Sequence, residues 1–235
     1  MNIVKLHATT STNEELKARF RESALPHLTT LYTMEQTNGK GQQGTTWISE
    51  KGKNLTFSIL LTENIQNLTP FLINKLLSVT LVEWLKKELQ VQATIKWPND
   101  ILSVHHKLAG ILIENNFSGK LLTSSVVGIG LNVNQETFEN LPRAISLKNI
   151  TGSAFDLERL LIGFLKLLQT NLRDPLRVTQ EYHRYLYKYN QMTSFKSSKG
   201  FFQGIVKGTD PDGKLLLQVN DQLNAFELKE LEWVY

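Results

Sequence analysis

Residues 94–134, "TIKWPNDILSVHHKLAGILIENNFSGKLLTSSVVGIGLNVN", consist of short apolar runs separated by polar or glycine-bearing turns. Runs of this length, rich in Ile, Leu and Val and bounded by Asn, Asp and Gly, are typical of strands joined by tight turns. The stretch therefore predicts a sheet built largely from hairpins. Gly128 and Gly130 lie inside its last apolar run, where glycine usually marks a bulge or the close approach of a backbone or ligand.

Helices are expected on either side of this sheet in the chain. Ser11 and Glu14 predict a capping box at the start of a first helix, and Thr69 and Pro70 supply an N-cap and a first-turn proline for another. Asp174 and Pro175 repeat the second pattern. Strands are expected at 3–7, 30–35 and 54–61, and helices from Ser11, from about 70 to 89, from 155 to 171 and from 175 to 189.

The tail from about residue 195 becomes strand-like again, around the strong turn "DPDG" at 210–213. We place a boundary near 190, giving a domain at 1–190 and a small barrel-like β module at 191–235. The fold class is α+β, with a mixed, largely antiparallel sheet and flanking helices.

The composition excludes several functional classes. The chain of 235 residues has no cysteine and a formal net charge of +4. Disulfides, thiolate zinc sites and thiol nucleophiles are thereby excluded, in agreement with a reducing compartment. The basic residues are dispersed, which gives no argument for nucleic acid. The most apolar long stretch is interrupted by Lys75 and Glu83, so we expect a cytoplasmic protein with no membrane partner.

Residues 36–47, "QTNGKGQQGTTW", place three glycines around one lysine. Gly39, Gly41 and Gly44 satisfy G-x-G-x-x-G, but β-forming residues follow. No helix is expected there to bind a pyrophosphate, so a dinucleotide site is excluded. The spacing of a P-loop is present without its Lys and Ser/Thr. The glycines alone favour a mobile hairpin connection.

The stretch "KWPND" at 96–100 combines a cation, an aromatic ring, a rigid turn, an amide and a carboxylate. In isolation it predicts a β-turn in which Asn99 and Asp100 cap their own backbone. Lys107 opens "KLAGILIE", and alone it would be a solvated lysine at a strand end. Gly110 in the same run permits another backbone to approach closely.

Taken together, five ordered motifs resemble the biotin protein ligase family over essentially the whole chain. They are S-T-N at 11–13, the glycine loop ending at Trp47, K-W-P-N-D at 96–100, K-L-A-G-I-L-x-E at 107–114 and G-I-G-L-N-V-N at 128–134. The resemblance implies a catalytic fold like that of class II aminoacyl-tRNA synthetases and biotin synthetase, with a C-terminal SH3-like barrel. It also implies a biotin–[acetyl-CoA-carboxylase] ligase, which makes biotinyl-5′-AMP from biotin and ATP and biotinylates a lysine of a biotin carboxyl carrier protein or domain.

The resemblance further implies roles for individual residues. Lys107 is the central cation, which contacts the biotin carboxylate and the α-phosphate, and Asp100 orients the attacking amine or accepts its proton. Residues implied in biotin binding are Ser11, Thr12, Asn13, Gln36, Lys40, Gly41, Gln42, Lys107 and Gly110. Residues implied in ATP binding are Lys40, Gln42, Asn99, Lys107 and Asn132. In this family the glycine loop orders when ligand binds, which shields the acyl phosphate from water.

No direct metal ligand is expected, and Mg²⁺ is carried by the ATP phosphates. His105 and His106 are adjacent in a strand, so their side chains point to opposite faces. A possible homodimer through a sheet edge stays open.

Two departures from the family pattern stand out. The family loop is often G-R-G-R-R-G, whereas this chain has Lys40, Gln42 and Gln43; glutamine brings no charge, so we expect weaker retention of the adenylate. The first strand is expected by residue 3, which predicts a monofunctional ligase without a DNA-reading module. Two alternatives remain. One is a lipoate or octanoate ligase of the same fold, which has a different glycine signature. The other is a non-catalytic biotin-binding protein, which would be expected to lose Lys107.

Overall fold

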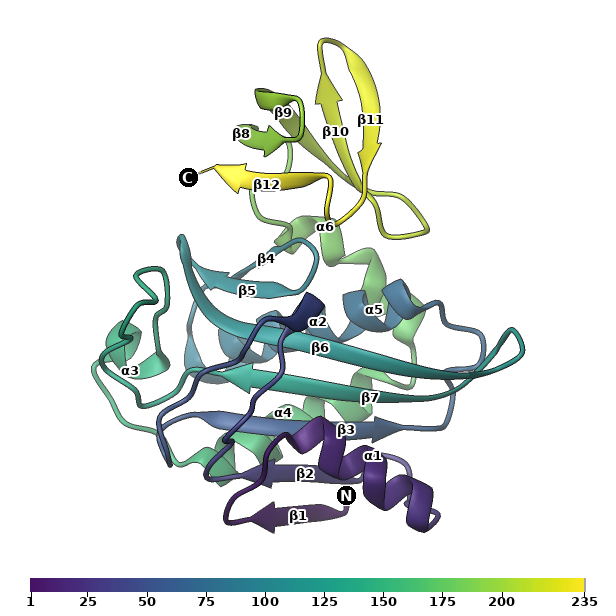
Figure 1. The fold of residues 1–235 in the computed structure, drawn as a ribbon, viewed down its shortest axis with the longest axis vertical. Helices are drawn as coiled ribbons and strands as arrows, with labels where there is room; N and C mark the ends of the chain where they lie inside the picture. Colours follow the sequence, from purple (N-terminus) through teal and green to yellow (C-terminus); the bar gives the residue numbers. More distant parts are fainter. Residues whose placement is uncertain (235) are drawn as a thin grey trace.

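The computed structural model describes residues 1–234, apart from the side chain of Gln43. A seven-stranded sheet forms the centre of the larger part of the molecule (Figure 1). Its strands are β1 (Ile3–Leu6), β2 (Thr30–Thr33), β3 (Leu55–Leu61), β4 (Thr94–Lys96), β5 (Asp100–Ser103), β6 (His106–Ser118) and β7 (Leu121–Leu131). Their order is β1-β2-β3-β7-β6-β5-β4, in which only the β1–β2 pair is parallel. The mixed, largely antiparallel sheet and the α+β class are confirmed.

The register of the hairpins brings the motif residues together. Asp100 on β5 lies opposite Gly110 on β6, and Gly110 lies opposite Gly130 on β7. Lys107 is opposite Leu102 on β5, beyond a register shift between Ile101 and Leu102. Because antiparallel neighbours are about 5 Å apart, the K-W-P-N-D, K-L-A-G-I-L-x-E and G-I-G motifs share one region of the sheet.

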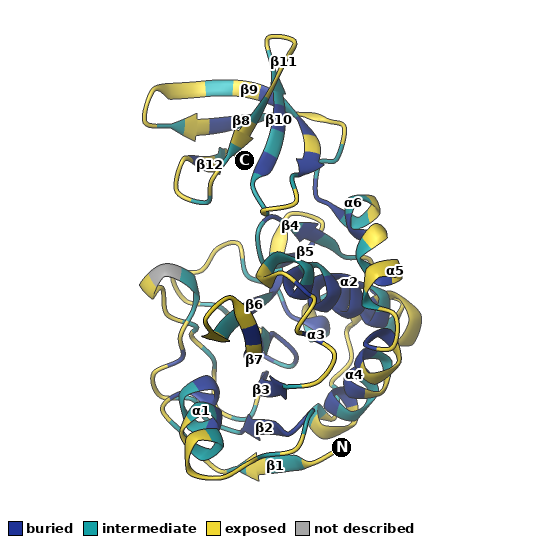
Figure 2. Ribbon diagram, turned by 90° about the vertical axis from the view of Figure 1, so that its right-hand side faces the viewer, coloured by how far each residue is buried: buried dark blue, intermediate teal, exposed yellow. Residues whose placement is uncertain are grey.

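Alternate residues of the central strands face different helical layers, as the period of a strand requires. Leu60 and Val126 pack against Leu16 of α1 (Thr12–Glu22), whereas Ile59 and Leu61 belong to the larger core. Figure 2 shows α1 on one face of the sheet and α2 and α4 on the other. Each fully buried aliphatic side chain contributes about 1.5–3 kcal/mol to these two cores.

Two of the helix starts follow the sequence signals. Thr69 accepts a hydrogen bond from the backbone N–H of Leu72 at 3.2 Å, and Asp174 does the same for Arg177. The remaining helices are α2 (Pro70–Leu89), α3 (Leu147–Thr151), α4 (Leu157–Asn171), α5 (Pro175–Gln180) and α6 (Tyr182–Tyr185). None of the described helices is both long and apolar enough to cross a membrane.

The helix expected at 175–189 is wrong over its last four residues. The helical segment is divided into α5 and α6, and it ends at Tyr185, after which Leu186 takes an extended conformation. Leu186 forms a bridge with Ile95, and the N–H of Tyr187 donates to the carbonyl of Ile95 at 2.8 Å. Strand β4 lies at the edge of the sheet, so its free backbone groups pair with the extended chain and end the helix.

The C-terminal strands form a separate five-stranded antiparallel sheet. They are β8 (Met192–Ser197), β9 (Gly200–Thr209), β10 (Leu215–Val219), β11 (Gln222–Phe226) and β12 (Leu231–Val234). The described strand pairings leave β11 and β12 as the two edges, so they do not close a barrel. The division into domains at 1–190 and 191–235 stays a prediction.

Candidate active site

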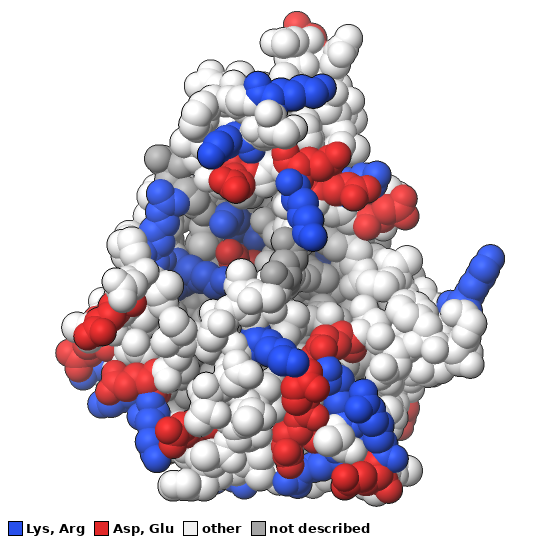
Figure 3. Space-filling view, viewed as in Figure 1, with Lys and Arg blue, Asp and Glu red and all other residues white. Residues whose placement is uncertain are grey.

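A cavity of about 420 Å³ lies where the motif regions meet. Figure 3 shows a hollow between the C-terminal sheet and the larger part of the molecule, with basic and acidic side chains inside it. Eleven of the twelve predicted site residues line this cavity: Ser11, Thr12, Asn13, Gln36, Lys40, Gly41, Gln42, Asn99, Asp100, Lys107 and Gly110. The structure therefore brings together residues from four separate segments of the chain.

Lys107 and Asp100 form the central ion pair of the cavity. The Lys107 Nζ lies 2.6 Å from Asp100 Oδ1, and the Lys96 Nζ lies 3.6 Å from Asp100 Oδ2. The backbone of Lys107 is fixed as well, because its N–H donates to Arg143 and its carbonyl accepts from Ile145. The Lys107 side chain is 38% exposed, so its ammonium is held on one side and open to the cavity on the other.

The N-terminal S-T-N turn forms a buried polar floor. Ser11, Thr12 and Asn13 are each less than 5% exposed. Gln36 Oε1 accepts hydrogen bonds from the N–H of Thr12 at 2.9 Å and from its hydroxyl at 3.3 Å. Ser58, which is fully buried on β3, lies 2.7 Å from the Thr12 hydroxyl and 2.5 Å from Asn13 Oδ1.

The capping box expected at Ser11 and Glu14 is wrong. Ser11 is the N-cap of α1, but its side chain makes no capping hydrogen bond. Glu14 instead accepts from Lys17 and from Lys40, both at 2.8 Å, and these bonds lower the pKa of Glu14 to about 2. A charged ammonium is a stronger partner for the carboxylate than a neutral backbone N–H, so the tertiary contact prevails.

The glycine loop is a small hairpin closed by backbone bonds. The N–H of Gly41 donates to Thr45 at 2.7 Å, and the N–H of Trp47 donates to Gly39 at 2.9 Å. A single 3₁₀ turn, Gln42–Gly44, replaces any helix at this point, as the β-forming residues predicted. Its one cation, Lys40, is fixed to Glu14 of α1, so the loop is attached to the S-T-N helix.

Trp47 packs against the glycines of β6 and β7, a contact that the sequence did not predict. A Cβ built on Gly130 would lie 2.6 Å from Trp47 Cζ2 and Nε1, and one on Gly110 would lie 3.3 Å from Cζ3. These two glycines face each other across β6 and β7. Their close neighbour is therefore a side chain, not another backbone. Gly110 and Gly130 lie on the two strands of one hairpin. Their pairing is the signal from which a flat binding surface could have been inferred.

The C-terminal part of the chain also lines the cavity. It contributes Leu228, Leu231, Glu232 and Trp233. Trp97 of the K-W-P-N-D turn donates its indole N–H to the carbonyl of Gly213 at 2.8 Å, in the turn between β9 and β10. The C-terminal sheet thus contacts the turn that carries Asn99 and Asp100.

A second cavity of about 420 Å³ lies on the other side of Trp47 and Lys107. Its wall includes Phe138, Leu141 and Ala144, together with the twelfth predicted residue, Asn132. The side-chain nitrogen of Asn132 already donates to the carbonyls of Lys107 and Ile145. Asn132 therefore holds the backbone of Lys107 and offers only its amide oxygen to a ligand.

Asn99 is bound in a similar way. Its side-chain nitrogen donates to the carbonyl of Ile111 at 2.8 Å, and the N–H of Ile111 donates back to the Asn99 carbonyl. Asn99 keeps its second amide hydrogen for a ligand, whereas both amide hydrogens of Asn132 are used, so a direct phosphate contact from Asn132 requires one of its bonds to break. The described residues hold no group of three or more His, Cys, Asp or Glu side chains arranged for a metal ion.

Comparisons with known proteins agree on one family. The sequence model of the biotin/lipoate A/B protein ligase family matches residues 6–132. The bifunctional ligase/repressor BirA of Bacillus subtilis is 26% identical over 96% of this chain and 72% of its own length. The biotin–[acetyl-CoA-carboxylase] ligase of Mycobacterium tuberculosis is 28% identical over 70% of this chain and 61% of its own length. Biotin protein ligase from Aquifex aeolicus, solved with biotin and ATP, is 27% identical with a TM-score of 0.80, over 98% of this chain and 97% of that one.

Proposed function

Because this chain belongs to the biotin/lipoate A/B protein ligase family, we propose that it joins biotin to ATP and then biotinylates a lysine of a carrier protein. In the first step a carboxylate oxygen of biotin attacks the α-phosphorus, and pyrophosphate leaves. In the second step the lysine amine attacks the acyl carbon of biotinyl-5′-AMP, AMP leaves and the amine loses a proton.

The observation that carries this proposal is the position of Lys107. Lys107 lines both cavities, and its ammonium lies 2.6 Å from Asp100. A carboxylate in one cavity and a phosphate in the other repel each other, and negative charge grows between them in the transition state. A fixed ammonium at that boundary stabilises this charge without reorganisation.

The first cavity suits biotin and the second suits the nucleotide. The S-T-N floor supplies buried hydrogen-bonding groups for a ureido ring, and the apolar wall around Phe138 and Leu141 suits a flat base. Lys40 and Gln42 of the glycine loop lie beside the first cavity, where they cover the ligand. Mg²⁺ would be held by phosphate oxygens and would neutralise part of their charge.

Asp100 has two roles in this scheme. Its carboxylate orients Lys107 during adenylate formation. During transfer it receives the carrier lysine, which would replace Lys96 or Lys107 beside the carboxylate. A lysine residue on an exposed turn of a biotin carboxyl carrier protein or domain is the proposed acceptor. Dimerisation of the ligase remains a separate prediction.

Exchange of labelled pyrophosphate into ATP tests the first step. The assay is run separately with biotin, lipoate and octanoate, each with Mg²⁺. Exchange that depends on biotin supports the proposal. Exchange with lipoate or octanoate alone would assign the protein to the other branch of the family, and the absence of exchange with all three would indicate a non-catalytic binding protein.

Incubation with ATP, Mg²⁺, biotin and a carrier domain tests the second step. The expected product is a carrier domain that binds streptavidin and has gained the mass of one biotinyl group. A carrier variant in which the acceptor lysine is replaced by arginine is the matched control, and it should remain unmodified. Labelling of that control to the same extent would contradict site-specific transfer.

A further inference from the structure

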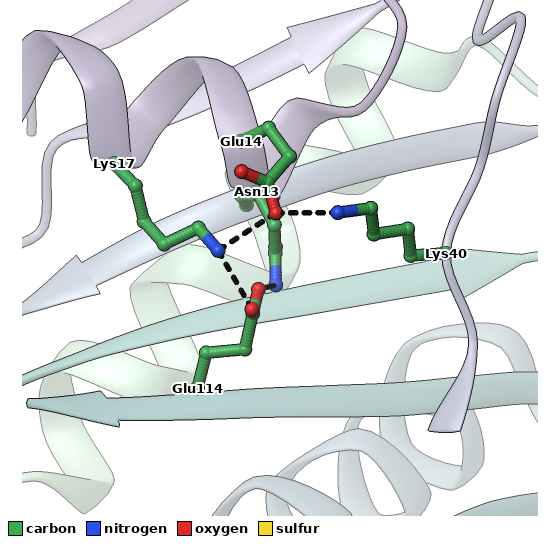
Figure 4. Close-up of polar contacts among 6 residues, drawn as sticks. Asn13, Glu14, Lys17, Lys40 and Glu114 are labelled. Atoms are coloured by element: carbon green, nitrogen blue, oxygen red, sulfur yellow. Dashed lines mark hydrogen bonds and ion pairs between the residues drawn. The ribbon is translucent and has the colours of Figure 1, made fainter. Parts of the chain in front are cut away.

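Glu114 closes the motif K-L-A-G-I-L-x-E and has no role in the scheme above. It lies on β6 and faces α1, and Figure 4 shows its carboxylate beside both Asn13 and Lys17. Glu114 Oε2 accepts a hydrogen bond from Asn13 Nδ2 at 2.7 Å, and Oε1 accepts one from Lys17 Nζ, also at 2.7 Å.

Lys17 forms an ion pair with this carboxylate. The Lys17 side chain is only 15% exposed and lies between Glu114 and Glu14. Burial lowers the pKa of Lys17, but its hydrogen bonds to the two carboxylates outweigh burial, and the net pKa is raised. An ionised carboxylate has no hydrogen to donate, so Glu114 is an acceptor only.

This constraint fixes the orientation of the Asn13 amide. Since Glu114 only accepts, Asn13 must turn its NH₂ group to Glu114 and its oxygen to the opposite side. There the oxygen lies 2.5 Å from the Ser58 hydroxyl, which must donate its single hydrogen to it. A Cβ on Gly128 would also lie 2.5 Å from Asn13 Oδ1, so the glycine leaves room for this arrangement.

The direction of each hydrogen bond, from donor to acceptor, is fixed at the next step toward the cavity as well. With its hydrogen used, Ser58 can only accept from the Thr12 hydroxyl, 2.7 Å away. The other partner of that hydroxyl, Gln36 Oε1 at 3.3 Å, is also an acceptor. Either way the hydrogen of Thr12 is directed to the protein, and its lone pairs are left for a ligand in the cavity that Thr12 lines.

We propose that Glu114 is a positioning residue that sets the hydrogen-bond polarity of the cavity floor and makes the Thr12 hydroxyl an acceptor for a ligand N–H. This inference rests on the proposed function, because the ureido ring of biotin carries two N–H donors. An acid without N–H groups, such as octanoate, gains nothing from such a floor. Glu114 therefore contributes to the choice of acid without touching it.

The test variant is Glu114→Gln, which preserves shape. Lys17 attracts the amide oxygen of the new side chain, so its NH₂ group faces Asn13. The Asn13 amide then flips, so that Ser58 accepts from Asn13 and donates to Thr12. One lone pair of the Thr12 hydroxyl is then occupied by Ser58 and is no longer free for the ligand. The dissociation constant for biotin, measured by calorimetry, should rise about ten-fold, while that for ATP stays within about two-fold.

Three further variants separate the effect of hydrogen-bond direction from that of the Lys17 charge and from a loss of folding. Lys17→Met removes the cation but keeps the acceptor, so its effect on biotin should be less than about three-fold. The double variant Lys17→Met/Glu114→Gln frees the glutamine oxygen to face Asn13, so it should bind biotin more tightly than Glu114→Gln alone. Ser58→Ala removes the link between Asn13 and Thr12, and because Thr12 can still donate to Gln36, it should weaken biotin binding less than Glu114→Gln does.

The side-chain NH₂ resonances of Asn13, assigned by comparison with Asn13→Ala, give a readout without ligand. One proton should be shifted downfield by the carboxylate in the wild type and in Lys17→Met, but not in Glu114→Gln. Equal biotin affinity of Glu114→Gln and wild type, or a double variant no better than the single one, overturns the inference. A wild-type protein that binds no biotin overturns the proposed function, while the resonances still decide the orientation of Asn13.

Discussion

Replacing Lys107 with alanine separates catalysis from stability. Lys107 lines both cavities, and its ammonium lies 2.6 Å from Asp100. A unit charge about 4 Å from the developing negative charge contributes about 4 kcal/mol at an effective dielectric constant of about 20. Loss of that contribution corresponds to about 10³-fold in the rate of adenylate formation. Pyrophosphate exchange at saturating biotin and ATP measures this rate.

The same substitution should have a small effect on stability. The Lys107 and Asp100 side chains are 38% and 18% exposed, and Lys96 remains 3.6 Å from the carboxylate. A pair of this kind contributes about 1 kcal/mol or less. Lys87→Ala on α2, which removes the ion pair with Glu83 at 3.2 Å, is the matched control. Exchange in Lys107→Ala within about three-fold of this control would refute the electrostatic argument.

Three further predictions follow from the glycine loop and its contacts. Gly130→Ala should move the Trp47 ring, destabilise the protein by about 1–3 kcal/mol and shift tryptophan fluorescence; an unchanged spectrum and unfolding curve would contradict the contact. Gln42→Arg should slow the release of biotinyl-5′-AMP, and equal release rates in wild type and variant would refute weaker retention. The folded-state pKa of Glu14 is lowered from 4.5 to about 2, so its bonds to lysine stabilise the protein above pH 4.5 and are lost as the pH falls toward 2. Unfolding free energies of wild type and Glu14→Gln should differ by about 1 kcal/mol or less at pH 7 and converge near pH 2, whereas a difference independent of pH would contradict the ion pairs.

Local sequence signals predicted the framework of the fold. Turn residues and apolar runs at 94–134 specified the hairpins, and Thr69 with Pro70 specified the start of α2. These signals succeed because a turn or a helix cap depends on residues only a few positions apart. Three of the five motifs converge because they lie on neighbouring strands of one sheet.

Contacts between distant segments were not predictable in this way. The contact of Trp47 with Gly130 and the hydrogen bond of Trp97 to Gly213 depend on which surfaces meet after folding. No local pattern contains that information. The failed capping box has the same cause, since Lys40, 26 positions away, competes for Glu14.

The structure of this protein with biotin and a non-hydrolysable ATP analogue tests the central claim most directly. The account predicts that Lys107 Nζ lies within hydrogen-bond distance of both a biotin carboxylate oxygen and an α-phosphate oxygen, with the glycine loop over the ligand. A lysine side chain directed to solvent, with biotin bound away from Ser11, Thr12 and Asn13, would contradict it.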